Sequence, residues 1–129
     1  MTILLICLFI ATALPILAKG PLAKAQNSQQ GGYDNRNPRE QQAALSGFGA
    51  RAKAAHENSF EALIMFVPGL LAVIVTGNTG QTPQILAITF VVARILYLIT
   101  YYIDQHTLRS LFWFVGFLSS LALIWLAIP

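Results

Sequence analysis

The residues best suited to chemistry are the few polar side chains that interrupt long apolar stretches. An ionisable group inside a membrane-spanning segment is costly, so it is a functional candidate by default. Arg51, Asn58 and Glu61 form the first such cluster. At 100° per residue in a helix, Arg51 and Asn58 project about 20° apart. Glu61 projects about 60° from Asn58, on the side away from Arg51. His56 points elsewhere, about 160° from Asn58, and is interpreted as a helix-end residue at the headgroup level.

A second cluster follows a spacing of three, four and three residues. Arg94, Tyr97, Tyr101 and Asp104 fall within about 80° of arc on a helix, so they form a single stripe. The tyrosines could instead belong to the aromatic belt at the membrane surface, which suits Tyr101 better than the deeper Tyr97.

Arg109 and Ser110 are the third candidate. An arginine at this position serves equally well as a positive anchor at the membrane surface or as a ligand for an anion. The sequence lacks the residue patterns of a metal site and of a serine nucleophile. The two histidines, His56 and His106, have neither the spacing nor the cysteine partners of a metal site, and no serine has a plausible His and Asp arrangement. We therefore expect no metal.

Glu61 and Arg94 are expected to lie at the same depth in the membrane. Each is about ten residues from the same end of its helix, or roughly 15 Å. One acid and one base at equal depth predict a buried ion pair, because each alone would cost roughly 2.5–3.5 kcal/mol at a helix centre. The polar stripes and Arg109 would then converge on a pocket for a small anionic ligand whose reaction partner arrives from the lipid.

The elements that must position these residues are long apolar segments. Charged residues make up 10% of the 129 residues, against about 25% in a soluble domain. A helix crosses the hydrocarbon core with roughly 20 apolar residues. The sequence therefore predicts an all-α, four-transmembrane-helix bundle and excludes a soluble enzyme, a disordered tail and a nucleic-acid-binding module. The expected spans are residues 1–18, 47–75, 83–103 and 108–128, with a polar loop over 19–46.

The first apolar block has two interpretations. A cleaved signal peptide would carry Lys or Arg before its apolar stretch, whereas the first positive residue is Lys19, which follows it. We therefore expect a retained span.

The basic residues predict an orientation. Six of the eight Lys and Arg lie between residues 19 and 53, and the connection between the second and third spans has none. By the positive-inside rule, loops 19–46 and 104–108 face the cytoplasm and both termini lie outside.

Two stretches of the sequence resemble a known membrane family. RAKAAHENSFEALIMF, from Arg51 to Phe66, and ARILYLITYYIDQHTLRS, from Ala93 to Ser110, resemble helix signatures of the membrane-associated proteins in eicosanoid and glutathione metabolism, the MAPEG family. The resemblance is closest to little-characterised bacterial members. It implies a homotrimer of four-helix subunits that binds glutathione between neighbouring subunits near the cytoplasmic side.

The resemblance also implies roles for individual residues. Asn58, Glu61 and Tyr101 match positions that contact glutathione in the enzymes of the family. Arg94 matches an arginine of the family's buried polar core, and Tyr97 falls where some members have tyrosine.

Arg109 matches the arginine proposed to hold the glutathione thiolate, and Ser110 matches the serine beside it in some synthases. The synthases carry an arginine four residues before the asparagine, where this chain has Ala54; Arg51 lies on the same helix face and is expected to replace it.

The leading interpretation is a glutathione-dependent membrane transferase or peroxidase that acts on a lipophilic electrophile. A non-catalytic lipid-binding or scaffold protein of the same fold is the first alternative, because a fold does not determine activity. A small four-span transporter is the second, because a buried glutamate also suits proton-coupled export.

Overall fold

The structure, a computed structural model that describes residues 1–129, consists of helices and their connections. The helices are α1 (Thr2–Asn27), α2 (Pro38–Ala43), α3 (Gly47–Val75), α4 (Gln81–Tyr102) and α5 (His106–Leu126). α1, α3, α4 and α5 are each long and apolar enough to cross a membrane. The predicted all-helical fold, with four helices of the length and composition of membrane spans, is therefore confirmed.

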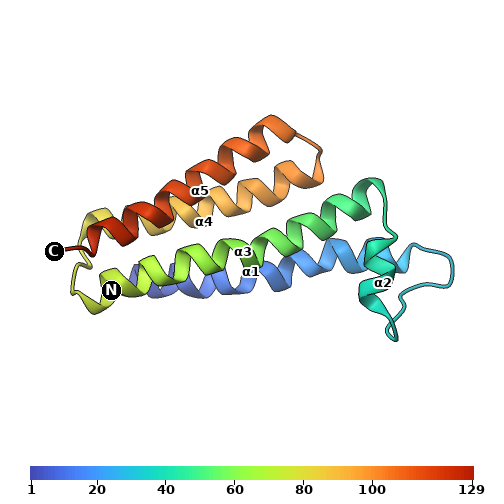
Figure 1. Cartoon of the computed structure of the whole chain (residues 1–129), viewed down its shortest axis with the longest axis horizontal. Coiled ribbons are helices and arrows are strands. Elements are labelled where there is room, and N and C mark those ends of the chain that lie inside the picture. Colours follow the sequence, from blue (N-terminus) through green and yellow to red (C-terminus); the bar gives the residue numbers. More distant parts are fainter.

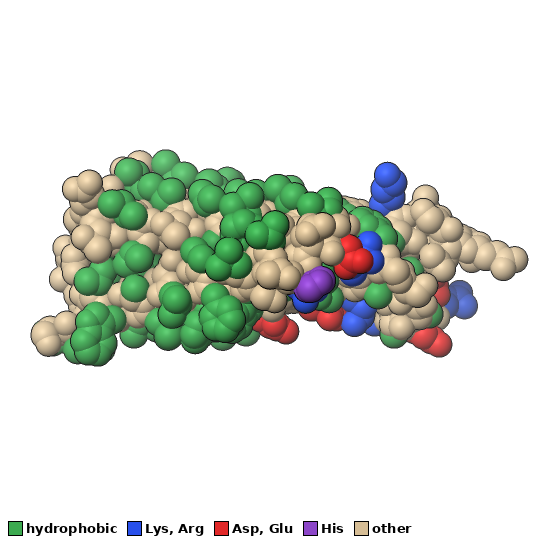
Figure 2. All heavy atoms as spheres, turned by 90° about the horizontal axis from the view of Figure 1, so that it is seen from above, with side chains coloured by type: hydrophobic (Ala, Val, Ile, Leu, Met, Phe, Trp, Pro, Cys, Tyr) green, Lys and Arg blue, Asp and Glu red, His purple; other side chains and the backbone are tan.

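The four long helices form two packed pairs. Figure 1 shows α1 beside α3 and α4 beside α5, with both chain termini at one end and α2 at the other. Charged side chains gather in the half that carries α2, while apolar side chains are spread over the other half of the visible surface, among backbone and other side chains (Figure 2). Such an outward apolar surface is expected where lipid, rather than water, surrounds the helices.

The core between the pairs is built from large apolar side chains and small contact residues. Phe66 of α3 and Phe90 of α4 stack with their ring centroids 3.8 Å apart. A Cβ atom on Gly69 of α3 would lie 2.8 Å from the backbone oxygen of Ser120 in α5. Glycine at this position therefore lets α5 approach α3 closely in the half of the bundle near the termini.

The polar segment after the first span differs from its prediction. The first helix does not end at Ala18 but continues through Pro21 to Asn27, and the expected loop contains the short helix α2. The loop over 19–46 is thus reduced to residues 28–37 and 44–46.

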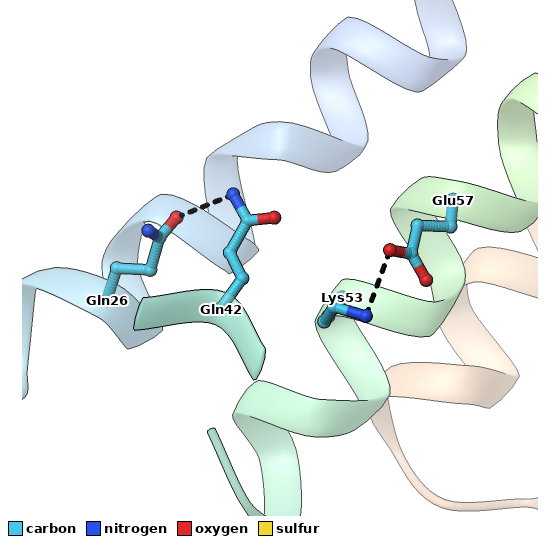
Figure 3. Close-up of polar contacts among 4 residues, drawn as sticks. All are labelled: Gln26, Gln42, Lys53 and Glu57. Atoms are coloured by element: carbon cyan, nitrogen blue, oxygen red, sulfur yellow. Dashed lines mark hydrogen bonds and ion pairs between the residues drawn. The ribbon is translucent and has the colours of Figure 1, made fainter. Parts of the chain in front are cut away.

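Hydrogen bonds of glutamine side chains stabilise the extended end of α1 and its contact with α2. The amide of Gln26 accepts from Lys19 Nζ at 3.0 Å and from Gln42 Nε2 at 3.3 Å. It donates to Gln41 Oε1 at 3.0 Å and to Pro38 O at 3.2 Å. Four hydrogen bonds saturate a primary amide, so buried Gln26 fixes the end of α1 against α2. Figure 3 shows the Gln26–Gln42 contact beside the Lys53–Glu57 ion pair of α3.

Candidate functional site

Arg94 is the buried centre of the polar cluster. Its side chain on α4 is only 3% exposed. Nη2 donates to Asn58 Oδ1 of α3 at 2.9 Å, and the guanidinium carbon lies 4.0 Å from the centre of the Tyr97 ring. The aliphatic part passes Gly116 of α5, where an added Cβ would lie 3.5 Å from Arg94 Cδ. Three helices therefore enclose one cation.

The direct ion pair expected between Glu61 and Arg94 is not formed. Asn58 lies between them: its Oδ1 accepts from Arg94, and its Nδ2 donates to Glu61 Oε2 at 2.7 Å. An amide can accept from a guanidinium and donate to a carboxylate at the same time. Asn58 and Glu61 are three residues apart and share a face of α3, so the amide takes the place nearer to Arg94.

The tyrosine stripe of α4 leads from this cluster to α5. Tyr97 and Tyr101 meet edge to face, with centroids 5.5 Å apart and ring planes 80° apart. The guanidinium carbon of Arg109 lies 4.4 Å from the centre of the Tyr101 ring. Cations attract the faces of aromatic rings at such distances. The contact therefore holds Arg109, which is only half-buried, at a defined position on the surface.

A recess of about 240 Å³ lies where these side chains meet. Three helices line it, through Asn58 of α3, Tyr97 and Tyr101 of α4, and Arg109, Ser110, Trp113 and Phe114 of α5. Its walls thus combine a cation, an amide, two phenols and a hydroxyl with two apolar rings. Such a site can hold an anionic or polar ligand beside an apolar one.

The comparisons with known proteins agree with the arrangement of helices. The model of the MAPEG family matches residues 3–129, which is nearly the whole chain. The chain belongs to the MAPEG family. No curated protein and no solved structure matches it. With its four apolar helices, this MAPEG chain is an integral, multi-pass membrane protein, and its family includes glutathione transferases and peroxidases.

The structure of this MAPEG chain brings five of the eight predicted site residues to the recess: Asn58, Tyr97, Tyr101, Arg109 and Ser110. Arg94 lies behind them, bonded to Asn58. Glu61 is on the other side of the Asn58 amide, with its side chain exposed at the surface of the chain.

Arg51 lies outside the recess. Its Nη1 is 3.5 Å from Asp104 Oδ2, in the turn between α4 and α5. Asp104 has a φ of 61°, a left-handed conformation that aspartate tolerates better than most residues. Arg51 thus links this turn to α3, and its expected role in place of the arginine absent at Ala54 stays a prediction.

Trp113 and Phe114 line the recess but were not predicted as site residues from the sequence. They lie four residues after Arg109 and Ser110 respectively, so each is one helical turn further along the same face of α5. That spacing places both rings on the helix face of Arg109 and Ser110. The apolar residues around them in the sequence instead favour an ordinary lipid-facing surface.

His56 points away from the polar face, as its helical position predicts. Its Nδ1 lies 2.8 Å from the backbone oxygen of Pro15 in α1. A carbonyl oxygen only accepts, so Nδ1 carries the hydrogen and donates it. His56 therefore links α3 to α1 and takes no part in the recess.

Proposed function

We propose that this protein is a glutathione-dependent transferase or peroxidase that acts on a lipophilic electrophile. One observation carries the proposal: Arg109 lies over Tyr101 at a recess that also receives Asn58 and Ser110. These are the residues that the family signatures associate with a bound thiol, and they come from three different helices.

Arg109 would stabilise the thiolate of glutathione. A free thiol has a pKa of about 8.5 and is mostly protonated at neutral pH, whereas the thiolate is the nucleophile. An adjacent cation favours the charged form and lowers the pKa of the thiol. Arginine is permanently charged and presents several donors in a rigid plane. In this proposal, Asn58, Tyr101 and the exposed carboxylate of Glu61 hold the polar groups of the tripeptide.

The electrophile would approach along α5 from the bilayer. Phe114 is 56% exposed and lies beside Trp113 at the recess. Trp113 also stacks on Phe117, with ring centroids 5.2 Å apart. These rings offer an apolar surface that continues from the recess toward lipid.

A homotrimer is part of the proposal because one subunit leaves the site open. Ligand pockets usually hold about 300–1,000 Å³, and the recess in one subunit holds about 240 Å³. Glu61 is exposed 14 residues from Val75, the end of α3, or about 21 Å along the helix. A carboxylate at such a depth avoids lipid. We propose that a neighbouring subunit covers Glu61 and closes the recess.

The orientation proposed from the basic residues places the α2 end in the cytoplasm. All the Lys and Arg other than Arg94 lie between residues 19 and 53 or at position 109, and positive residues favour the cytoplasmic side. Cysteine labelling in intact cells tests this. An impermeant reagent that labels Gln30→Cys but not Asn78→Cys would reverse the orientation.

Calorimetric titration of the purified protein with glutathione and with an S-alkyl glutathione tests the proposed function. We expect both to bind and a generic aromatic electrophile to be conjugated. Asn35→Ala, a change at an exposed loop residue, is the control variant. Binding without turnover would favour the lipid-binding or scaffold alternative. Absence of thiol binding would contradict the proposal and leave the transporter alternative. The lack of a direct Arg94–Glu61 ion pair is compatible with a transporter, because proton-coupled export needs a glutamate that is free to bind a proton.

A further inference from the structure

A groove at the α2 end of the bundle has no part in the proposed reaction. It holds about 450 Å³ and lies between the last two turns of α1 and the beginning of α3. Pro21, Ala25 and Phe48 provide apolar walls, and Lys24 and Ser28 provide polar ones. The three α1 residues and Ser28, which directly follows α1, are spaced three, one and three apart, so they lie along one helix face.

The groove lies at the depth of lipid headgroups. Lys19 is the first charged residue after the apolar part of α1, so it marks the edge of the hydrocarbon core. Lys24 is five residues further on, about 7.5 Å along the helix. The headgroup layer on each side of a bilayer is about 5–7.5 Å thick, given a total of about 40–45 Å around a core of about 30 Å. Lys24 therefore lies at the outer edge of the headgroup layer, where its long side chain can reach a lipid phosphate.

The charge of Lys24 is not neutralised within the chain. The ion pairs of the protein join Arg51 to Asp104 and Lys53 to Glu57. The Lys24 side chain is exposed and forms neither an ion pair nor a hydrogen bond. Ser46, at the N-cap position of α3, forms no side-chain hydrogen bond with the first turn. Phe48 of that turn lines the groove, so the positive end of the α3 dipole lies near it.

We propose that this groove binds the headgroup and upper acyl chain of an anionic phospholipid. The Lys24 ammonium binds the phosphate, and Phe48 with the Pro21 and Ala25 side chains packs against the chain. A freely dissolved phosphate would use the ammonium but not the apolar walls, whereas a lipid uses both. The site is separate from the recess at Arg109, so it stands whether or not the protein is a glutathione enzyme.

Lipid titration in a neutral maltoside detergent, followed by native mass spectrometry of the full chain, tests this proposal. Phosphatidylglycerol and phosphatidylcholine with identical acyl chains are the two probes. One lysine near an anionic lipid surface contributes about a fivefold gain in affinity. We therefore expect phosphatidylglycerol to bind at least about fivefold more tightly than phosphatidylcholine.

Matched variants locate the preference. Lys24→Gln should bring phosphatidylglycerol affinity down to that of phosphatidylcholine. Arg36→Gln removes an equal charge from an exposed loop residue outside the groove and should preserve the preference. Phe48→Ser should lower the affinity for both lipids to the same extent. Equal melting temperatures in detergent without lipid verify that each variant is folded.

Three results would overturn the proposal. The wild type could bind both lipids equally, or Lys24→Gln and Arg36→Gln could lose the preference to the same extent, which would indicate diffuse attraction. Millimolar inorganic phosphate could displace phosphatidylglycerol, which would indicate a site for a dissolved anion.

Discussion

Asn58 receives a hydrogen bond from buried Arg94 at 2.9 Å and thereby joins α3 to α4 at the centre of the bundle. The same amide donates to Glu61 at 2.7 Å. A neutral residue thus connects a cation and an anion that do not touch. The cation stays with the protein core, and the carboxylate is left exposed at the surface of the chain.

Asn58→Ala should destabilise the bundle. Arg94 would keep the Tyr97 ring and a 3.4 Å contact with the Asn58 backbone oxygen, but would lose its side-chain acceptor. Loss of one partner of a buried polar group costs about 1–3 kcal/mol. Thermal unfolding in detergent measures this, with Asn35→Ala as the exposed control.

Glu61 and Arg94 should be coupled in large part through Asn58. In a double-mutant cycle, Glu61→Gln and Arg94→Met should deviate from additivity by more than about 0.5 kcal/mol. The deviation should shrink in an Asn58→Ala background, where only the through-space attraction of the two charges remains. A coupling of unchanged size there would mean that the amide does not carry it.

Gly69 and Gly116 provide a matched pair for helix packing. A Cβ on Gly69 would lie 2.8 Å from a backbone oxygen of α5, whereas a Cβ on Gly116 would be 3.5 Å from Arg94 Cδ, an ordinary contact. Gly69→Ala should therefore force α3 and α5 apart and cost about 1–3 kcal/mol. Gly116→Ala should be neutral or slightly stabilising, since alanine favours helix. Thermal unfolding of both variants compares them; equal melting temperatures would show that the α3–α5 contact adjusts freely.

Helical spacing predicted more of the site than of its detailed pairing. Tyr97 and Tyr101 are four residues apart, and one turn of helix brings their rings together whatever surrounds them. The partner of Arg94 depends on which residue of α3 faces α4. A depth estimate from residue counts does not separate Asn58 from Glu61, which lie within one turn of each other.

The continuation of α1 to Asn27 could not be predicted for a different reason. Pro21 and the polar composition after Ala18 favour a helix end in local terms. The helix is instead stabilised by Gln26, whose partners Gln41 and Gln42 are 15 and 16 residues away. Such long-range hydrogen bonds leave no periodic signal in the sequence.

Trp113 should contribute to electrophile binding. It lines the recess, whereas Trp125 is 75% exposed near the C-terminus. If the proposed function holds, Trp113→Leu should raise the KM for an aromatic electrophile several-fold and leave the affinity for glutathione almost unchanged. Trp125→Leu is the control. Steady-state kinetics with calorimetry separates the two effects, and equal KM values in both variants would exclude Trp113 from the electrophile site.

Arg109 distinguishes a membrane anchor from a thiolate ligand. An anchor needs only positive charge, so Arg109→Lys would be nearly silent. A thiolate ligand needs a donor at one position, and the contact with the Tyr101 ring provides that position; lysine differs in reach and geometry. Each unit by which the pKa of the bound thiol falls corresponds to about 1.4 kcal/mol of preference for the anion.

We therefore expect thiolate ultraviolet absorbance when the wild type binds glutathione at neutral pH. A bound thiol whose pKa is lowered from about 8.5 is ionised over a pH range in which free glutathione is still protonated. Arg109→Lys should weaken the absorbance and Arg109→Ala should abolish it, while unfolding temperatures stay similar because Arg109 is only half-buried. An unchanged thiolate signal in Arg109→Ala, with glutathione still bound, would identify Arg109 as an anchor, and the catalytic role proposed for it would be wrong.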